Sequence, residues 1–346
     1  MSGVKITTDW HIGVSRTGGT TTESLAALRA YLRSSLAAQL GNEDHIIAGD
    51  LFDSFTIDTA ELVSTFNIFS EWLKRSGKTL VLLRGNHDYH QSAWKVSSFD
   101  LLGHVLSSGF PDQVVIVDHP RVWRQFVLIP HMANQDIFQM EINKIISSGV
   151  SDKVIVVHAN VDNPYAAESQ HGLNITRDTL EALCEKNVVV CGHEHQHRVL
   201  NDHACVVLGN GAPSSIADCL GPDRKYAALF HGTSYTLRPI WFRENEYCEM
   251  NWREINENSA KFIRVVGNAS MNESADVVNA VSRLRQLSNA FVIANAVAVE
   301  GMQQFEQLEA ASLESVKAFD VIGAIMQELT ETERIVVKGL LDAPKN

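Results

Sequence analysis

Five short clusters of histidine, aspartate and asparagine carry the ligand chemistry of this sequence. In chain order they read TTDWHIG, AGDLFD, RGNHD, VIVVH and CGHEHQH, and each lies at the end of an apolar run. Imidazole, carboxylate and amide groups together suit manganese, iron or zinc better than calcium. The residues of these clusters that could bind metal are Asp9, His11, Asp50, Asn86, His158, His193 and His195.

The spacing within two of the clusters predicts pairs of ligands. Residues i and i+2 of an extended segment point the same way, so Asp9 and His11 can grip one ion together. His193 and His195 form a second pair for the same reason. Loops at the carboxyl ends of parallel strands meet in one crevice, so we expect the clusters to converge. A ligand set of this size with one shared carboxylate could hold two ions about 3.5–4 Å apart.

A single pair of this kind has an ordinary explanation. Asp-x-His and His-x-His pairs arise by chance on surfaces and in cores, and Gly-Asp and Gly-Asn are common turns. The informative feature is the ordered set, in which every cluster follows a predicted strand. Convergent titratable groups are typical of active sites, so we interpret the set as one catalytic centre.

The apolar runs belong to an alternation of strand and helix patterns, which is typical of sheets covered on both faces. The predicted strands are Val4–Thr8, His45–Gly49, Thr79–Arg84, Val114–Val117, Phe126–Pro130, Val154–His158 and Val188–Cys191. The predicted helices are Glu23–Leu40, Thr59–Ser76, Asp136–Ser147 and Thr176–Glu185. Three strands without helices between them predict a second sheet, namely Ala204–Leu208, Tyr226–Phe230 and Ser234–Ile240. We therefore predict an α/β fold, a four-layer α/β/β/α sandwich.

The polar stretch 241–258 predicts a domain boundary. Beyond it, Lys261–Gly267, Ala275–Leu287 and Ala290–Glu300 predict a small strand–helix–strand unit. The remaining residues predict a helical tail. The expected domains are a catalytic domain at 1–243, a capping domain at 244–303 and a helical segment at 304–346.

The helical tail carries an apolar stripe at helical spacing. Its members are Leu313, Val316, Phe319, Ile322, Ile325, Met326 and Leu329. Two interpretations fit this pattern. The stripe could lie in the groove of a partner protein, or it could fold back on the core of its own chain.

Composition limits the classes of protein that this chain can be. A net charge of −12 argues against gripping nucleic acid mainly through a basic face. The five cysteines are an odd number without CxxC spacing, so we expect reduced thiols. No apolar run of about eighteen residues and no signal-like N-terminus occurs, so we expect no membrane span and a cytoplasmic location.

The clusters in their order resemble the calcineurin-like metallophosphoesterase superfamily, whose pattern reads DxH, GDxxD, GNHD, H and GHxH. The resemblance implies two divalent ions, with Mn²⁺ expected first and Mg²⁺, Fe²⁺ or Zn²⁺ as alternatives. It implies that one ion is held by Asp9, His11, Asp50 and His195. It implies that the other is held by Asp50, Asn86, His158 and His193, with Asp50 bridging. It also implies that His87 protonates the leaving oxygen and that Asp88 orients His87.

Within this superfamily the chain looks most like the SbcD-type break-repair nucleases, including their phage counterparts. The resemblance rests on the clusters across residues 5–197, the stretch LGNGAPSSIADCLGPDRKYAALF, the strand–helix–strand unit and the helical tail. It implies a DNA exonuclease, with endonuclease activity as a further expectation, that acts with an SbcC-type ATPase in end processing, recombination or repair. It also implies a homodimer through helices near Thr59–Ser76. Some members have a histidine where this chain has Asp53, so we assign Asp53 no catalytic role.

Two alternatives and several weaker site assignments remain open at this point. A cyclic-nucleotide phosphodiesterase or a phosphoprotein phosphatase of the same superfamily would share the metal ligands. The stretches GDLFDSF and GNHD depart from the GDxVDRG and GNHE of phosphoprotein phosphatases. A non-catalytic scaffold would be expected to have lost ligands. Residues that could contact substrate, because they lie near the clusters or carry positive charge, are His90, His197, Arg16, Arg84 and Lys225.

Overall fold

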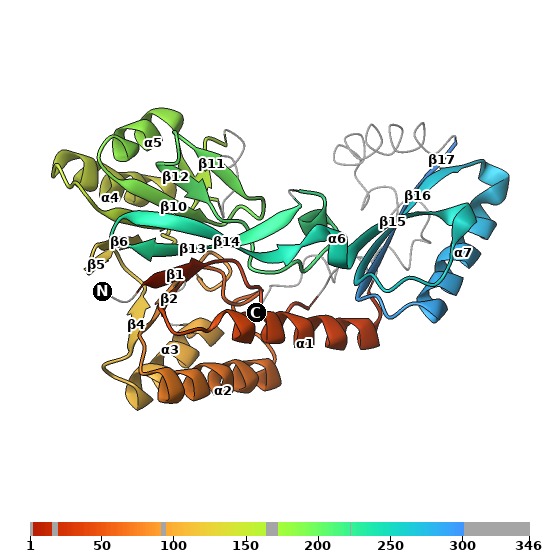
Figure 1. Ribbon diagram of the computed structural model, residues 1–346, viewed down its shortest axis with the longest axis horizontal. Coiled ribbons are helices and arrows are strands. Elements are labelled where there is room, and N and C mark those ends of the chain that lie inside the picture. The colour runs from red at the N-terminus through yellow and green to blue at the C-terminus, as the bar shows by residue number, and fades with distance from the viewer. Residues whose placement is uncertain (1–2, 16–19, 91–94, 164–171, 222, 301–346) are drawn as a thin grey trace, which may run out of the picture.

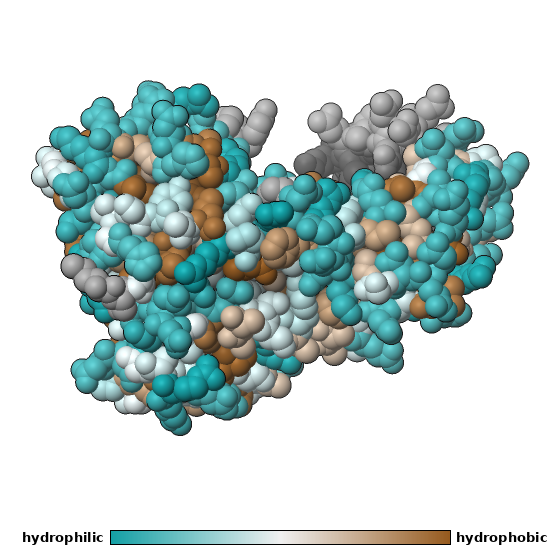
Figure 2. Space-filling view, viewed as in Figure 1, coloured by the Kyte–Doolittle hydropathy of each residue, from teal (hydrophilic) through white to brown (hydrophobic). Residues whose placement is uncertain are grey.

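The computed structural model describes residues 3–15, 20–90, 95–163, 172–221 and 223–300. The predicted helical tail at 304–346 and Arg16 lie outside the described residues. None of the described helices is long and apolar enough to cross a membrane. Figure 2 shows polar residues over most of one face, with hydrophobic residues in smaller groups between them.

The first sheet has six strands in the order β14-β13-β1-β2-β3-β4. Strands β1 to β4 are parallel, and the β13–β14 hairpin adds to β1 in antiparallel fashion. The six strands span β1 Val4–Thr7, β2 Asp44–Ala48, β3 Leu80–Leu83, β4 Val114–Val117, β13 Arg224–His231 and β14 Ser234–Phe242.

The second sheet has six strands in the order β11-β12-β10-β7-β6-β5. Its four central strands are parallel, and the two edge strands are antiparallel to their neighbours. They span β5 Arg121–Trp123, β6 Phe126–Ile129, β7 Val154–His158, β10 Val188–Gly192, β11 Arg198–Leu200 and β12 Cys205–Val207. Strands β8 Asn160–Val161 and β9 Asn174–Ile175 form a small separate pair.

The expected membership of the second sheet was wrong. Only β12 of the three strands expected there belongs to it, because β13 and β14 return to the first sheet. The second sheet begins much earlier, at β5. An apolar period identifies a strand but not its neighbour, and the hydrogen bonds of β13 to β1 join residues more than two hundred positions apart.

Helices cover the outer faces of both sheets, and this confirms the predicted four-layer α/β/β/α sandwich (Figure 1). Between the sheets, residues such as Ile6, Ile46, Val156 and Val190 are fully buried in a shared core. The first sheet is covered by α1 Thr22–Gln39, α2 Thr59–Ser76 and α3 Ser98–Gly109, and the second by α4 Gln135–Ser147 and α5 Arg177–Cys184. Helix α3 was not among the predicted helices; Ser97 and Asp100 form a capping box at its start.

A third sheet follows the short helix α6 Arg243–Glu246. It consists of β15 Tyr247–Asn251, β16 Phe262–Ala269 and β17 Val292–Val299, all parallel, with α7 Ser274–Leu287 packed on it. The predicted strand–helix–strand unit corresponds to β16, α7 and β17, whereas β15 lies in the stretch expected to be a boundary. The proposed domain limits stay a prediction.

The third sheet is attached to the four-layer body through α1, which runs beneath both (Figure 1). The ring of Tyr31 on α1 lies 6.3 Å from that of Phe262 and 5.2 Å from that of Phe291. The Tyr31 hydroxyl donates to Glu246 over 2.6 Å. An aromatic contact of this kind, closed by a hydrogen bond, holds the third sheet beside the body.

Candidate metal centre

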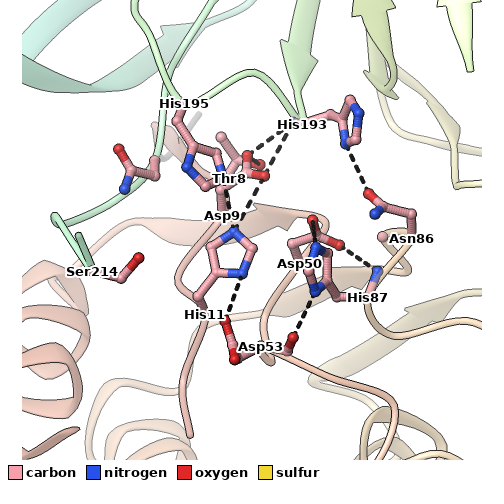
Figure 3. Close-up of polar contacts among 12 residues, drawn as sticks. Thr8, Asp9, His11, Asp50, Asp53, Asn86, His87, His193, His195 and Ser214 are labelled. Atoms are coloured by element: carbon pink, nitrogen blue, oxygen red, sulfur yellow. Dashed lines mark hydrogen bonds and ion pairs between the residues drawn. The ribbon is translucent and has the colours of Figure 1, made fainter. Parts of the chain in front are cut away.

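The predicted ligands lie where strands of both sheets end. Asp9 and His11 follow β1, Asp50 follows β2 and Asn86 follows β3 in the first sheet. In the second sheet, the ligands lie at the end of β7 and just after β10. Figure 3 shows side chains from both sheets pointing toward one another. The structure therefore brings together the residues whose spacing predicted a shared centre.

Asp9, His11 and His195 form the first group. Ligand atoms of the three side chains all lie within 4.8 Å of one another. The Nε2 atoms of His11 and His195 are 3.0 Å apart, and Nε2 of His11 is 4.0 Å from Oδ1 of Asp9. Two imidazole nitrogens and a carboxylate that converge in this way are a suitable ligand set for a transition-metal ion.

Asp50, His158 and His193 form the second group, again with ligand atoms within 4.8 Å of one another. Nε2 of His158 lies 3.2 Å from Oδ2 of Asp50. The side-chain oxygen Oδ1 of Asn86 lies 3.0 Å from Nε2 of His158 and 2.8 Å from Nδ1 of His193. The side chain of Asn86 thus completes the second group with an oxygen ligand.

Main-chain hydrogen bonds join the two groups. The amide of His193 donates to Oδ2 of Asp9 over 2.9 Å, which ties the end of β10 to the first group. The amides of Trp10 and His11 both donate to the carbonyl oxygen of Asp50, over 2.9 and 3.1 Å. These contacts hold the loops of three strands at fixed spacing. The bridging role of Asp50 stays a prediction.

Four of the predicted ligands have a left-handed backbone. The φ angles are 52° at Asp9, 46° at His11, 46° at Asp50 and 83° at His193. Residues other than glycine adopt this region seldom, and such residues cluster at functional sites, where the surrounding structure holds them in place. The backbone is therefore bent at each loop so that its side chain points into the centre.

Two glycines make room for the ligands. A Cβ atom at Gly85 would lie 2.1 Å from Oδ1 of Asp50, and one at Gly49 would lie 2.1 Å from Nδ1 of His158. Real atoms do not approach this closely, so only glycine fits at either position. The glycines of the AGDLFD and RGNHD clusters thus permit close approach of backbone to ligand.

The rings of two histidines are fixed by partners on the far nitrogen. Nδ1 of His158 donates to the carbonyl oxygen of Ala48 over 2.9 Å. Nδ1 of His195 lies 2.7 Å from Oδ1 of Asp218. A proton on Nδ1 leaves Nε2 as the lone-pair nitrogen, and metal-binding histidines are commonly oriented in this way. The donor set and its orientation therefore fit the divalent cations that the sequence predicted.

A model of the calcineurin-like phosphoesterases matches residues 3–197, which is more than half of the chain's 346 residues. The chain belongs to this family. It is therefore a metal-dependent hydrolase of phosphoesters, and the predicted superfamily is confirmed. A comparison with curated proteins finds no match. Among solved structures, TT1561 of Thermus thermophilus is similar, with 13% identity and a TM-score of 0.40 over 69% of this chain and 99% of that chain.

Charge in the centre of this calcineurin-like phosphoesterase is arranged for cations. Burial lowers the pKa of His11 to about 3 and that of His193 to about 4, so both rings are neutral near pH 7. Burial opposes ionisation of Asp50, but His158 beside it holds the pKa of that carboxyl well below its usual range. Burial also disfavours a charged His158, yet Asp50 raises the pKa of His158 to about 9. A cation that binds here must therefore displace the His158 proton.

His87 lies at the open edge of the centre, with 41% of its side chain exposed. Its ring is 4.9 Å from the ring of His11, at nearly a right angle. Nδ1 of His87 lies 2.6 Å from the carbonyl oxygen of Asp53, and Nε2 lies 4.0 Å from Oδ2 of Asp50. The ring is thus oriented by the main chain, with Nε2 toward the metal ligands (Figure 3).

Asp88 contacts backbone amides, and the orientation of His87 by Asp88 stays a prediction. The Asp88 carboxylate is buried and accepts the amides of Gly85 over 3.0 Å and Phe52 over 3.2 Å. These bonds tie the RGNHD loop to the loop after β2, while the His87 ring contacts the main chain of Asp53. Burial, with Asp50 close by, raises the pKa of Asp88 to about 7. A buried carboxylate accepts hydrogen bonds from the backbone amides nearest to it, because buried polar groups are almost always paired.

Sequence reasoning missed two carboxylates at the centre. Oδ1 of Asp53 lies 3.6 Å from Nδ1 of His11, and Asp53 forms a third close group with His11 and His87. Asp218 contacts His195 from the other side. The second aspartate in GDLFD and the position of Asp218 in the 208–230 stretch were visible signals, but neither showed which histidine it would reach.

The residues that the sequence assigned to substrate contact have different surroundings. Lys225 is 3% exposed, and its ammonium group contacts the Asn210 side chain and the carbonyl oxygen of His195, so it supports the centre from inside. Arg84 donates to the carbonyl oxygen of Asp118 over 2.7 Å, and its guanidinium lies over the Tyr89 ring. His197 contacts the carbonyl oxygen of Val207, and His90 contacts Lys95. For Arg84, His90 and His197 a contact with substrate stays a prediction.

Proposed function

We propose that this phosphoesterase is a two-metal DNA exonuclease that works with an SbcC-type ATPase in end processing, recombination or repair, with endonuclease action as a second expected activity. The observation that carries the proposal is the set of metal ligands gathered from both sheets with His87 at its open edge. The alternatives within the family are hydrolysis of cyclic nucleotides or of phosphoproteins. They share this centre and differ in what surrounds it.

In the proposed reaction, bound divalent ions would lower the pKa of a coordinated water and neutralise charge on the phosphoryl oxygens. The chain supplies the geometry and a proton. Asp9, Asp50 and the buried imidazoles hold the ligand atoms in place before substrate arrives. His87, fixed through Nδ1 by Asp53, would protonate the departing sugar oxygen from Nε2. General acid catalysis of this kind contributes about 10²–10⁴-fold to rate.

A polymeric substrate is supported by the surroundings of the centre. The ring of His87 is open to solvent at the edge of the centre, so a substrate can approach it from outside. Between the start of α1 and the third sheet lies a cavity of about 820 Å³ lined largely by polar residues, with Lys261 and Arg285 on its wall. Lysine and arginine contact phosphates and position a nucleic acid without reading its sequence. We propose that this wall guides the DNA backbone.

The surface offers support for a homodimer. Helices α2 and α3 pack together and expose the apolar side chains of Val63, Leu101 and Val105. We propose that these exposed apolar side chains contribute to the interface. This is the helix region in which the resemblance places the dimer contact. The proposed ATPase contact belongs to the tail at 304–346, outside the described residues.

A substrate panel tests the proposal. The full chain is incubated with Mn²⁺ and, in parallel, linear duplex DNA, circular single-stranded DNA, cyclic AMP and a phosphopeptide. We expect hydrolysis of linear DNA at a rate at least tenfold above the other classes, with nucleotide products. Faster release of nucleoside monophosphate from cyclic AMP, or of inorganic phosphate from the peptide, would assign the chain to one of the alternatives. Circular DNA separates endonuclease from exonuclease action.

A further inference from the structure

A buried carboxylate lies directly behind one of the metal ligands. Asp218 is 5% exposed and sits in the short turn Ala217–Cys219. Its Oδ1 atom is 2.7 Å from Nδ1 of His195. The His195 side chain is 36% exposed, whereas that of Asp218 is 3% exposed. Hydrogen bonds to an ionised, buried carboxylate are strong because little water competes for its oxygens.

The second oxygen of Asp218 is fully engaged elsewhere. Oδ2 accepts the amides of Ser214 and Ser215 over 2.9 and 3.0 Å. It also accepts both serine hydroxyls over 3.0 Å. Two of these donors are backbone amides, which can only donate. The carboxylate is therefore locked in one orientation, with Oδ1 toward His195. Figure 3 shows Ser214 on the His195 side of the centre.

The main chain of His195 is held from the same segment of sequence. Nζ of Lys225 lies 3.4 Å from the carbonyl oxygen of His195, and the same ammonium contacts the side chain of Asn210. The amide of Asn210 donates to the His195 carbonyl over 3.4 Å. The stretch that runs from the end of β12 into β13 thus restrains both the ring and the backbone of His195. A single imidazole ligand receives support that converges from three side chains.

We propose that Asp218 is the positioning residue of the first metal group, acting through His195 by fixing the Nδ1–H tautomer that leaves Nε2 free toward His11. The inference rests on the metal centre of the proposed function and is independent of the DNA substrate. Partners of this type behind metal-binding histidines typically change metal affinity or activity about 10–100-fold when removed. The effect should fall on one ion rather than on both, because His158 and His193 have other partners.

The substitution Asp218→Asn gives a sharp test. The amides of Ser214 and Ser215 would select the new side-chain oxygen, so the NH₂ group would face His195. That group is a donor, and it would favour a His195 ring with its proton on Nε2, which cannot bind a cation. Asp218→Ala removes the partner without imposing a tautomer. We therefore expect Asp218→Asn, the closer match in shape, to impair metal binding at least as much as Asp218→Ala.

The probe is Mn²⁺ alone, titrated into the metal-free full chain against a chelating dye, with EPR to distinguish ion pairs from single ions. Wild type should bind two ions. Asp218→Asn should weaken one of them about 10–100-fold and leave the other within about twofold. The matched control is Asp44→Asn, since Asp44 is equally buried and pairs with Arg124 over 2.6 Å at the opposite end of β2. It should retain both ions.

Two further measurements separate positioning from a general structural role. Long-range ¹⁵N NMR of labelled histidine reads the tautomer, and Asp218→Asn should move the His195 proton from Nδ1 to Nε2. In a double-mutant cycle, Asp218→Asn should cause no further loss of affinity when His195 is already glutamine. The inference is overturned if the Asp218 variants bind both ions as wild type does, lose both equally, or act additively with His195→Gln. If either Asp218 variant is unfolded, the other carries the same comparison.

Discussion

Nε2 of His11 and Nε2 of His195 lie 3.0 Å apart, although 184 residues separate the two histidines along the chain. One follows the first strand of the first sheet and the other follows a central strand of the second. The distance depends on how two six-stranded sheets pack, and on left-handed backbone at Asp9, His11 and His193. Single substitutions at residues that hold this arrangement, or that act beside it, should therefore have different effects on metal binding and on turnover.

Replacement of His87 should separate metal binding from turnover. His87→Ala should keep both Mn²⁺ ions and lose about 10²–10⁴-fold in kcat, because a general acid is removed and no ligand is. Metal titration and initial rates on linear DNA measure the two quantities. His119→Ala is the control, since His119 is 72% exposed and lies between β4 and β5. Loss of metal with turnover retained would contradict the assignment of His87.

Gly85→Ala should damage the centre without removing a ligand. The added Cβ would overlap Asp50, whose Oδ1 atom lies 2.1 Å from the position it would occupy. We expect a loss of Mn²⁺ affinity of at least tenfold, because close-packed backbone and ligand cannot both stay in place. Gly109→Ala is the control, since a Cβ at Gly109 meets no atom within 4 Å. Equal metal binding by the two variants would show that a Cβ atom at Gly85 can be accommodated without displacing Asp50.

The predicted and observed structures agree most where the signal is local. Strand ends and ligand types are read from neighbouring residues, so the members of the centre could be found from sequence. Membership of a sheet could not, because the pairing of β13 with β1 depends on contacts remote in sequence. The contacts of Asp53, Asp88 and Asp218 could not be found from sequence for a related reason. Which group a carboxylate reaches is decided by turn geometry and by nearby amides, not by spacing.

The stability of the metal-free chain should fall in acid, with His45 contributing. Burial, helped by Lys5, lowers the pKa of His45 to about 3 from its ordinary value of 6.5. A depressed histidine pKa gives stability that is complete above pH 6.5 and lost as pH falls toward 3, because the unfolded chain takes up the proton first. Urea unfolding measures the free energy of unfolding at each pH across this range. The slope of this free energy against pH should be smaller in His45→Gln than in wild type by up to about 1.4 kcal/mol per pH unit.

The exposed His104 on α3 provides the comparison for this experiment. His104→Gln replaces a histidine on the surface instead of one in the core, so it controls for the substitution itself. An identical slope in wild type and His45→Gln would mean that His45 is protonated in the folded chain. In the contact of its Nε2 with the Thr7 hydroxyl over 2.8 Å, the ring nitrogen would then donate and the hydroxyl oxygen accept.

The cavity wall beside α1 should matter for DNA and not for small substrates. Replacing Lys261 and Arg285 by alanine should raise KM for linear DNA and reduce the salt dependence of binding by about two in log–log slope. Hydrolysis of bis-p-nitrophenyl phosphate should stay within about twofold of wild type. The comparison measures KM at several salt concentrations. Equal effects on both substrates would mean that Lys261 and Arg285 support the structure of the metal centre and do not contact DNA.

Removal of residues 310–346 should separate the tail from the chemistry. If the apolar stripe binds an ATPase partner, the shortened chain should lose that binding and keep its basal Mn²⁺-dependent hydrolysis. Co-purification with an SbcC-type ATPase and the rate on linear DNA report on the two properties. A shortened chain that no longer folds would favour the other interpretation, in which the stripe packs on the core of its own chain.

The central claim is that two cations share one centre built from both sheets. Diffraction from crystals grown with Mn²⁺, measured at the manganese absorption edge, tests it most directly. We predict two anomalous peaks, one against Asp9, His11 and His195 and the other against Asn86, His158 and His193, with Asp50 touching both. A single peak, or a second peak remote from Asp50, would refute a shared two-metal centre.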